Sequence, residues 1–518
     1  MGVFDRLSEY GVGTVWGPVG GVHVGPAVGR LMLIILYLPE GSDDCVVALD
    51  KDILEYALDR ALGKGVEYVE ARAHSVHQEQ IVLRNGILEA YLQSVDCGFN
   101  VRVLADGGLG FASTNRWTKA EAVAETAFKL ARASGRKDKI RFSEMESNVA
   151  DWRVEEKEKI LDVDPESKIG LLSGIDKKVT AQGVEVPSRI LQCFINLNEK
   201  YFINSEGSRI ASYVPKVACF IIISVKEEGK MEQAMRQFGY SGGWEAFDVW
   251  NIADELVHET MVLQRVIKEG KPLKPGKMSL VCGTEVVGIA AHESCGHPME
   301  ADRILGREMS QAGRSFIYPR GPYWLGSRIG SDLVTIVDDP GVENSYGFYE
   351  YDDEGVKARP RYLYKEGVIN EFFHNRETAA KLGVENNGSA RAVNYNREAI
   401  VRMANTYLLP GDMSEEELLE DVKHGVYMKS FTEWNIDDRR FNQRYVGREA
   451  YLIENGEVGA PVAKPTIEMT TEGFWSAVDG ITKDLRFDAA TCGKGDPMQG
   501  LPVYTGGPII RLTGVHMK

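Results

Sequence analysis

Very short turns between strand-like segments most constrain the fold of this chain. Four such segments follow one another in the first half, at residues 66–73, 80–83, 87–92 and 98–104. Asn85-Gly86 separates the second from the third, and this dipeptide favours a two-residue hairpin turn between antiparallel strands. Helical patterns at residues 50–62 and 118–134 flank the strands. The sequence therefore predicts an α+β fold whose first domain combines helices with antiparallel strands.

The second half also has strand-like segments, and one stretch divides the two halves. Residues 270–276 read Gly-Lys-Pro-Leu-Lys-Pro-Gly, a composition typical of a domain boundary. Beyond it strands dominate, and we expect one long helix at residues 414–427. We predict an unassigned extension at 1–47, an N-terminal α+β domain at 48–270, and a strand-rich C-terminal domain at 271–518 that carries a metal-binding helix.

Charge and apolar patterning limit the possible partners. The 518 residues include 60 Lys and Arg against 76 Asp and Glu, a net charge of −16 that disfavours nucleic acid and anionic membranes. The longest apolar run, Leu31 to Leu38, is far shorter than the roughly 20 residues of a membrane-spanning helix. Seven scattered cysteines without a C-x-x-C pair are typical of a reducing compartment. We therefore predict a cytoplasmic protein without a membrane partner.

One segment carries a recognisable pattern of metal-binding side chains. His292-Glu-Ser-Cys-Gly-His297 contains H-E-x-x-x-H, which resembles the H-E-x-x-H of zinc peptidases with one extra residue. On a regular helix, positions i and i+4 differ by roughly 40°, whereas i and i+5 differ by roughly 140°. Gly296 and Pro298 favour a break or a one-residue widening of the last turn. We predict that such a distortion brings His292 and His297 together.

A metal site needs at least one further protein ligand. Cys492, in Thr-Cys-Gly-Lys-Gly, is the better candidate because the flanking glycines permit close backbone approach. Cys295 lies within the motif, but we expect it to pack as a small apolar side chain. Only nine histidines occur in the chain, so a metal site is favoured here over a packed helix, which is the competing interpretation.

Other polar residues have two readings each. Glu300 is able to orient a histidine ligand or to form an ion pair with Arg303 or Arg307. The pairs Asp338-Asp339 and Asp352-Asp353 look like oxygen-ligand sites, but we expect them to lie in turns or ion pairs. For His374 we expect a surface or packed position rather than a catalytic one.

A series of motifs over the second half resembles a known family. The matching blocks lie at residues 292–302, 336–339, 352–355, 402–411, 449–456, 492–495 and 501–503. In this order they resemble the TldD/PmbA metallopeptidases, and a weaker likeness extends back to about residue 50. The first 47 residues look foreign to the family pattern.

The resemblance implies a function for four residues. By position, His292, His297 and Cys492 match the metal ligands of the family and Glu293 matches its catalytic base. The resemblance thus implies a TldD-like, Zn²⁺-dependent peptidase that hydrolyses unfolded or short peptides. It also implies a homodimer or a heterodimer with a PmbA/TldE-like subunit. The alternative is a non-catalytic, peptide-binding or regulatory subunit with a structural metal site, which would need the ligands but no base.

Overall fold

A computed structural model describes residues 35–36, 49–307, 313–318 and 320–518. The extension expected at 1–47 lies outside these residues apart from the pair at 35–36. The class predicted from the sequence, α+β with a strand-rich C-terminal region, is confirmed. The domain bounds 48–270 and 271–518 stay a prediction.

The first half of the described chain builds one large sheet. Its strands are β1 (Ile35–Leu36), β2 (Tyr68–Arg84), β3 (Ile87–Ala105), β4 (Gly108–Thr114), β5 (Val149–Arg153), β6 (Glu185–Asn204), β7 (Arg209–Glu227) and β8 (Lys230–Ser241). The four segments expected around Asn85-Gly86 merge into the two long strands β2 and β3. They merge because β3 and β6 both supply backbone partners along nearly the whole of β2.

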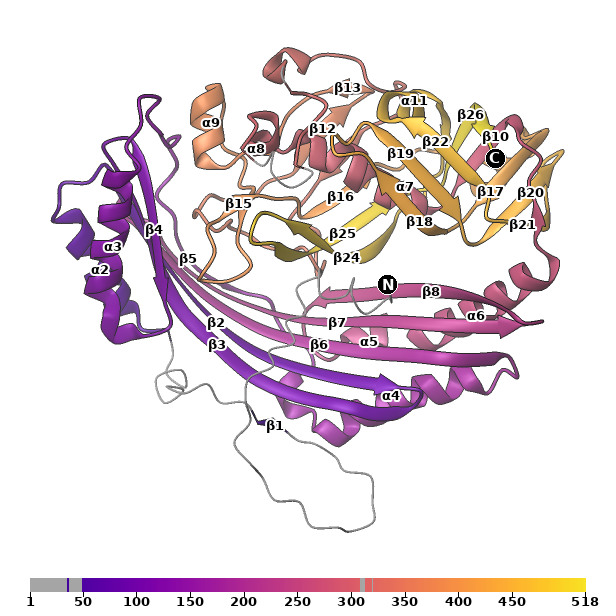
Figure 1. Cartoon of the computed structure of the whole chain (residues 1–518), viewed down its shortest axis with the longest axis horizontal. Helices are drawn as coiled ribbons and strands as arrows, with labels where there is room; N and C mark the ends of the chain where they lie inside the picture. The colour runs from indigo at the N-terminus through magenta and orange to yellow at the C-terminus, as the bar shows by residue number, and fades with distance from the viewer. Residues whose placement is uncertain (1–34, 37–48, 308–312, 319) are drawn as a thin grey trace, which may run out of the picture.

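Helices cover the outer side of this sheet, while the C-terminal half of the chain lies on its inner side (Figure 1). The helices are α2 (Lys51–Leu62), α3 (Ala120–Ala133), α4 (Pro165–Thr180), α5 (Ala246–Val249) and α6 (Ile252–Glu269). Helices α2 and α3 share one apolar core with the sheet, and α4 and α6 share another. None of the helices in the described residues is long and apolar enough to cross a membrane.

The C-terminal half builds further sheets. The larger contains β9 (Lys271–Pro272), β10 (Gly276–Cys282), β17 (His424–Met428), β18 (Phe431–Ile436), β19 (Asn442–Gly447), β20 (Ala450–Glu454), β21 (Glu457–Ala463), β22 (Thr466–Thr470), β23 (Val478–Ile481) and β26 (Ile510–Met517). The smaller contains β11 (Ile336–Asp338), β12 (Arg361–Lys365), β13 (Val368–Ile369), β16 (Asn405–Leu408), β24 (Arg486–Lys494) and β25 (Gln499–Gly507). Strands β14 (Ala390–Arg391) and β15 (Ile400–Val401) pair with each other. Short helices connect these strands: α7 (Thr284–Ala290), α8 (Ala301–Ile304), α9 (Arg376–Leu382), α10 (Glu415–Glu420) and α11 (Thr471–Ser476).

The long helix expected at residues 414–427 is wrong. Helix α10 starts there with a capping box between Ser414 and Glu417, as a helical pattern requires, but it ends at Glu420. The chain then enters β17, which pairs with β10 on one side and β20 on the other. Two strand partners thus outweigh a helix preference that is worth only tenths of a kcal/mol per residue.

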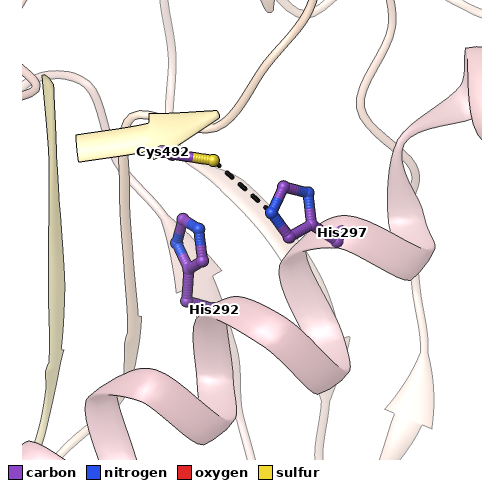
Figure 2. A group of neighbouring side chains, drawn as sticks. All are labelled: His292, His297 and Cys492. Atoms are coloured by element: carbon purple, nitrogen blue, oxygen red, sulfur yellow. Dashed lines mark hydrogen bonds between the residues drawn. The ribbon is translucent and has the colours of Figure 1, made fainter. Parts of the chain in front are cut away.

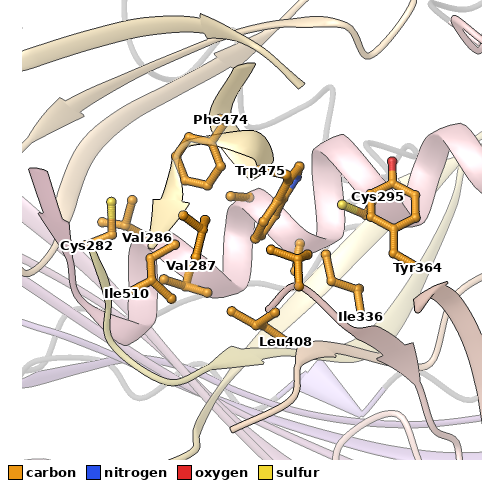
Figure 3. Packing of buried hydrophobic residues seen from close by; sticks show 14 of the residues in the cluster. Cys282, Val286, Val287, Cys295, Ile336, Tyr364, Leu408, Phe474, Trp475 and Ile510 are labelled. Carbon is orange, nitrogen blue, oxygen red and sulfur yellow. The ribbon is translucent and has the colours of Figure 1, made fainter. Parts of the chain in front are cut away.

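Helix α7 runs through the centre of the C-terminal core. Val286 and Val287 are fully buried on it, and Trp475 and Leu408 belong to the same cluster (Figure 3). Cys295 lies in this cluster beside Tyr364, as expected for a packed cysteine. The H-E-x-x-x-H segment follows α7 directly, so the buried helix places this segment within the C-terminal core.

Candidate metal centre

The histidines of the motif meet through a distorted turn. After α7 the chain forms a wider, π-helical turn at Ala291–Gly296 and then a tighter turn at His297–Met299. The wider turn absorbs the extra residue of the motif. The two imidazole rings lie with centroids 4.9 Å apart and planes at 82° (Figure 2). The predicted widening is confirmed.

The reason given for that widening is only partly right. Gly296 has ordinary helical angles, φ −59° and ψ −64°, so it does not use the conformational freedom of glycine. A Cβ at this position would instead lie 2.0 Å from Sδ of Met403, so close packing requires the glycine. His297 also keeps helical angles, φ −58° and ψ −41°, although Pro298 disfavours them.

Cys492 approaches these rings from a distant strand. It lies on β24, and its Sγ is 3.4 Å from Nε2 of His297 (Figure 2). One potential ligand atom from each of His292, His297 and Cys492 lies within 4.8 Å of the others, and all three side chains are buried. The structure therefore brings the three expected residues together.

The chemistry of this donor set fits a zinc ion. Tetrahedral zinc with bonds of about 2.0–2.3 Å separates its ligand atoms by roughly 3.3–3.8 Å, which a small side-chain rotation would reach here. Burial lowers the pKa of both His292 and His297, which favours the neutral, metal-binding imidazole. Nδ1 of His292 is buried without a hydrogen-bond partner in the described residues. A buried imidazole nitrogen without a hydrogen-bond partner is suited to bind a cation.

The sulfur is equally suited to bind a cation. Burial opposes ionisation of the Cys492 thiol, but His297 and Arg402 together outweigh burial and lower its pKa to about 7. A thiolate is the form that binds metal. Arg402 also donates a hydrogen bond to the backbone carbonyl of Cys492. It therefore holds strand β24 in place in addition to favouring the thiolate.

Glu300 takes both roles that the sequence left open. Its Oε2 lies 3.0 Å from Nδ1 of His297, which leaves Nε2 directed towards Cys492. The same carboxylate is paired with Arg303, and Lys494 Nζ lies 3.4 Å away. Burial raises the pKa of Glu300, but these cations and His297 hold it well below its usual range. Arg307, the other expected partner, pairs with Glu377 instead.

Glu293 has a partner that the sequence did not reveal. Its Oε2 accepts a hydrogen bond of 2.7 Å from Nη1 of Arg440. Arg440 comes from the turn between β18 and β19, 147 residues away in sequence. No local pattern links a turn arginine to a distant helix, since only spacings of three or four residues bring helix side chains together.

The other polar candidates have structural contacts. Nδ1 of His374 is 3.3 Å from the Thr378 hydroxyl. Asp338 forms a buried ion pair with Arg361, and Asp352 accepts hydrogen bonds from nearby backbone N–H groups. We find these residues packed or paired, as expected.

Comparison with known proteins decides the family. A family model described as the PmbA/TldA metallopeptidase C-terminal domain matches residues 275–518, and the models for domain 1 and the central domain match residues 69–131 and 158–264. A metalloprotease of Methanothermobacter thermautotrophicus is 31% identical over 448 residues, which cover 86% of this chain and 94% of the relative. The chain belongs to the PmbA/TldD metallopeptidase family.

Other members of the PmbA/TldD family agree in length and fold. A zinc metalloprotease TldD homolog of Saccharolobus solfataricus is 27% identical over 433 residues, 81% of this chain and 89% of the relative. The crystal structure of TldE from Thermococcus kodakarensis superposes with a TM-score of 0.71 at 15% identity, over 90% of this chain and 99% of that one. The second likeness shows the fold alone.

Proposed function

We propose that this protein is a zinc-dependent metallopeptidase of the TldD type. The convergence of His292, His297 and Cys492 on one buried point carries this proposal. Two neutral imidazoles and one thiolate would hold the ion and leave a fourth position for water or substrate. When bound, zinc supplies Lewis acidity, which lowers the pKa of a water molecule and polarises a carbonyl group.

Glu293 is the proposed general base beside these ligands. Arg440 occupies Oε2 of this carboxylate, so Oε1 is the atom that would accept the proton of the attacking water. The protonated Oε1 would then donate to the leaving amine. Arg440 acts through Glu293 in this scheme, because its hydrogen bond orients the carboxylate.

The strand that carries Cys492 offers a place for an extended peptide. In the described residues β24 is the end strand of its sheet and pairs only with β25, although the side chain of Gln237 on β8 reaches Thr491 on it. An extended chain can add to such an edge through main-chain hydrogen bonds, which read the backbone rather than the side chains. This geometry suits unfolded or short peptides.

Metal analysis combined with a peptide-hydrolysis assay tests the proposal. We expect the Glu293→Gln variant to retain zinc and to lose hydrolysis of an unstructured peptide, because glutamine cannot accept the proton. The Glu457→Gln variant is a control, since this exposed residue lies on β21. Unchanged hydrolysis in Glu293→Gln would remove Glu293 as the base.

One observation favours the alternative of a non-catalytic subunit. The ion pair with Arg440 occupies one oxygen of the Glu293 carboxylate, as a purely structural glutamate would show. A protein of this kind would bind zinc and peptide but show no hydrolysis in the wild type.

For the assembly we propose a homodimer or a heterodimer with a PmbA/TldE-like subunit. For the location we propose the cytoplasm, where a thiolate ligand stays reduced.

A further inference from the structure

Two side chains of β24 project to the same side of the strand. Cys492 and Lys494 are two residues apart and both are buried, whereas Gly493 between them is exposed. Alternate residues of a strand share one face, so both side chains reach towards the H-E-x-x-x-H segment and the residues after it. Cys492 contacts His297, and Lys494 contacts Asp302.

The contacts of Lys494 use all of its hydrogen-bond donors. Nζ donates to Oδ1 and Oδ2 of Asp302 at 2.7 and 2.8 Å and to the carbonyl of Val401 at 2.7 Å. It also lies 3.4 Å from Oε2 of Glu300. An ammonium group has three N–H donors, and each of them has an acceptor here, so the position of this buried side chain is well defined.

These contacts connect the two parts of the chain that supply the proposed metal ligands, the H-E-x-x-x-H segment and β24. Glu300 holds Nδ1 of His297, and Lys494 lies between Glu300 and Asp302. Two buried carboxylates are paired here, Glu300 with Arg303 and Asp302 with Lys494. Without Lys494, the carboxylate of Asp302 would lose its ammonium partner in a buried place, which costs far more than a lost surface contact.

We propose that Lys494 is a positioning residue for the metal centre. Its bonds to Asp302 and its approach to Glu300 hold the strand of Cys492 at a distance from His297 that one cation bridges. The inference rests on the proposed function, because it requires that these side chains bind a metal. Lys494 itself binds neither metal nor substrate.

Metal affinity of four proteins tests this role. We compare wild type, Lys494→Met, the double variant Lys494→Met/Asp302→Asn, and the control Lys518→Met, which removes an exposed ion pair with Glu468. The measurements are Zn²⁺ affinity by chelator competition, the sulfur-to-metal charge-transfer band of the Co²⁺-loaded protein, and thermal unfolding of the metal-free protein. The double variant leaves no buried carboxylate without a cation, since Glu300 keeps Arg303.

We expect both Lys494 variants to lose about 10–100-fold in zinc affinity, as is typical when contacts around metal ligands are removed. Their cobalt band should weaken, while the metal-free double variant unfolds close to wild type and Lys518→Met is unchanged in every measurement. If Lys494→Met does not fold, the double variant decides. Wild-type affinity in the double variant would overturn the inference. A wild type that binds neither metal would contradict the proposed function and the inference together.

Discussion

Arg440 donates a hydrogen bond of 2.7 Å from Nη1 to Oε2 of Glu293, and both side chains are largely buried. The turn that presents Arg440 is itself fixed. Its N–H bonds the carbonyl of Asp437, and its carbonyl accepts from the Thr471 hydroxyl at 3.0 Å. Arg440 has φ of 62°, which an unconstrained arginine rarely adopts. A rigid turn therefore holds one oxygen of the proposed base.

Replacing Arg440 by glutamine tests this contact. A hydrogen bond to a charged group contributes about 1.5–3 kcal/mol, so we expect kcat/KM for peptide hydrolysis to fall roughly 10–100-fold. Zinc content should stay unchanged because no ligand is touched. Arg439→Gln is the control, since that neighbouring side chain is exposed. Equal activity in the two variants would show that Glu293 does not need Arg440.

The sequence could predict the parts of this site that lie close together in the chain. Helical geometry alone required a distortion between His292 and His297, and the structure has it. Cys492 and Arg440 are different, because each lies in a local hairpin, β24–β25 or β18–β19, and the sequence of a hairpin does not show where it lies relative to the histidines. The Cys492 hairpin, for example, is placed by the pairing of β25 with the distant strand β16. The glycines beside Cys492 made it a candidate, and the family resemblance matched it to a metal ligand. Nothing local indicated Arg440, since its turn contains only ordinary polar residues.

The fold shows the same division. The hairpin turn at Asn85-Gly86 could be predicted from the sequence, because such a turn needs positive φ at both central residues, which Asn and Gly tolerate. The structure has φ of 50° at Asn85 and 75° at Gly86. Residues 424–428 were misread as helix, because β10 and β20 pair with them from distant parts of the sequence. Local preference decides an element only where tertiary pairing does not compete with it.

Close packing at Gly296 predicts sensitivity to a single methyl group. The added Cβ of Gly296→Ala would meet Sδ of Met403 at 2.0 Å, and such overpacking costs about 1–3 kcal/mol. We expect a lower unfolding temperature and reduced zinc content, since the turn carries both histidines. Gly170→Ala in α4 is the matched control, because nothing lies within 4 Å of its added Cβ. A zinc-replete, stable Gly296→Ala protein would refute the packing argument.

Asp353 predicts a pH-dependent contribution to stability. It lies 2.8 Å from Nζ of Lys200 and 3.6 Å from Nη1 of Arg72, so it ties the large sheet to the C-terminal half. Burial raises its pKa, but Lys200 and Arg72 outweigh burial and hold the pKa well below its usual range. A carboxylate whose pKa is lower in the folded state stabilises the protein above the unfolded value of about 3.9. This stability is lost as the pH falls towards the folded pKa.

We therefore expect Asp353→Asn to lose up to about 3–5 kcal/mol at pH 7, because the buried Arg72 and the partly exposed Lys200 lose a carboxylate partner. The loss should shrink as the pH drops below about 4, because the unfolded chain then binds a proton at this carboxyl group while the folded wild type still keeps it ionised. Urea unfolding at neutral and acid pH measures both effects. Asp138→Asn, which breaks an exposed pair with Arg136, should change neither curve. An equal deficit at all pH values would contradict the ionic origin.

The two cysteines near the motif give opposite predictions. Cys492→Ser replaces a soft thiolate by a hydroxyl, so we expect zinc affinity to fall more than the roughly 10–100-fold typical of lost contacts around ligands. Stability of the metal-free protein should change little, because the volumes are similar. Cys295→Ser replaces a buried sulfur by a smaller hydroxyl that has Ser294 and Tyr364 as neighbours, so we expect a loss of about 1 kcal/mol. Its zinc affinity should stay that of wild type. Chelator competition and thermal unfolding of both variants separate a ligand from a packing residue, and reversed results would assign the sulfur ligand to Cys295.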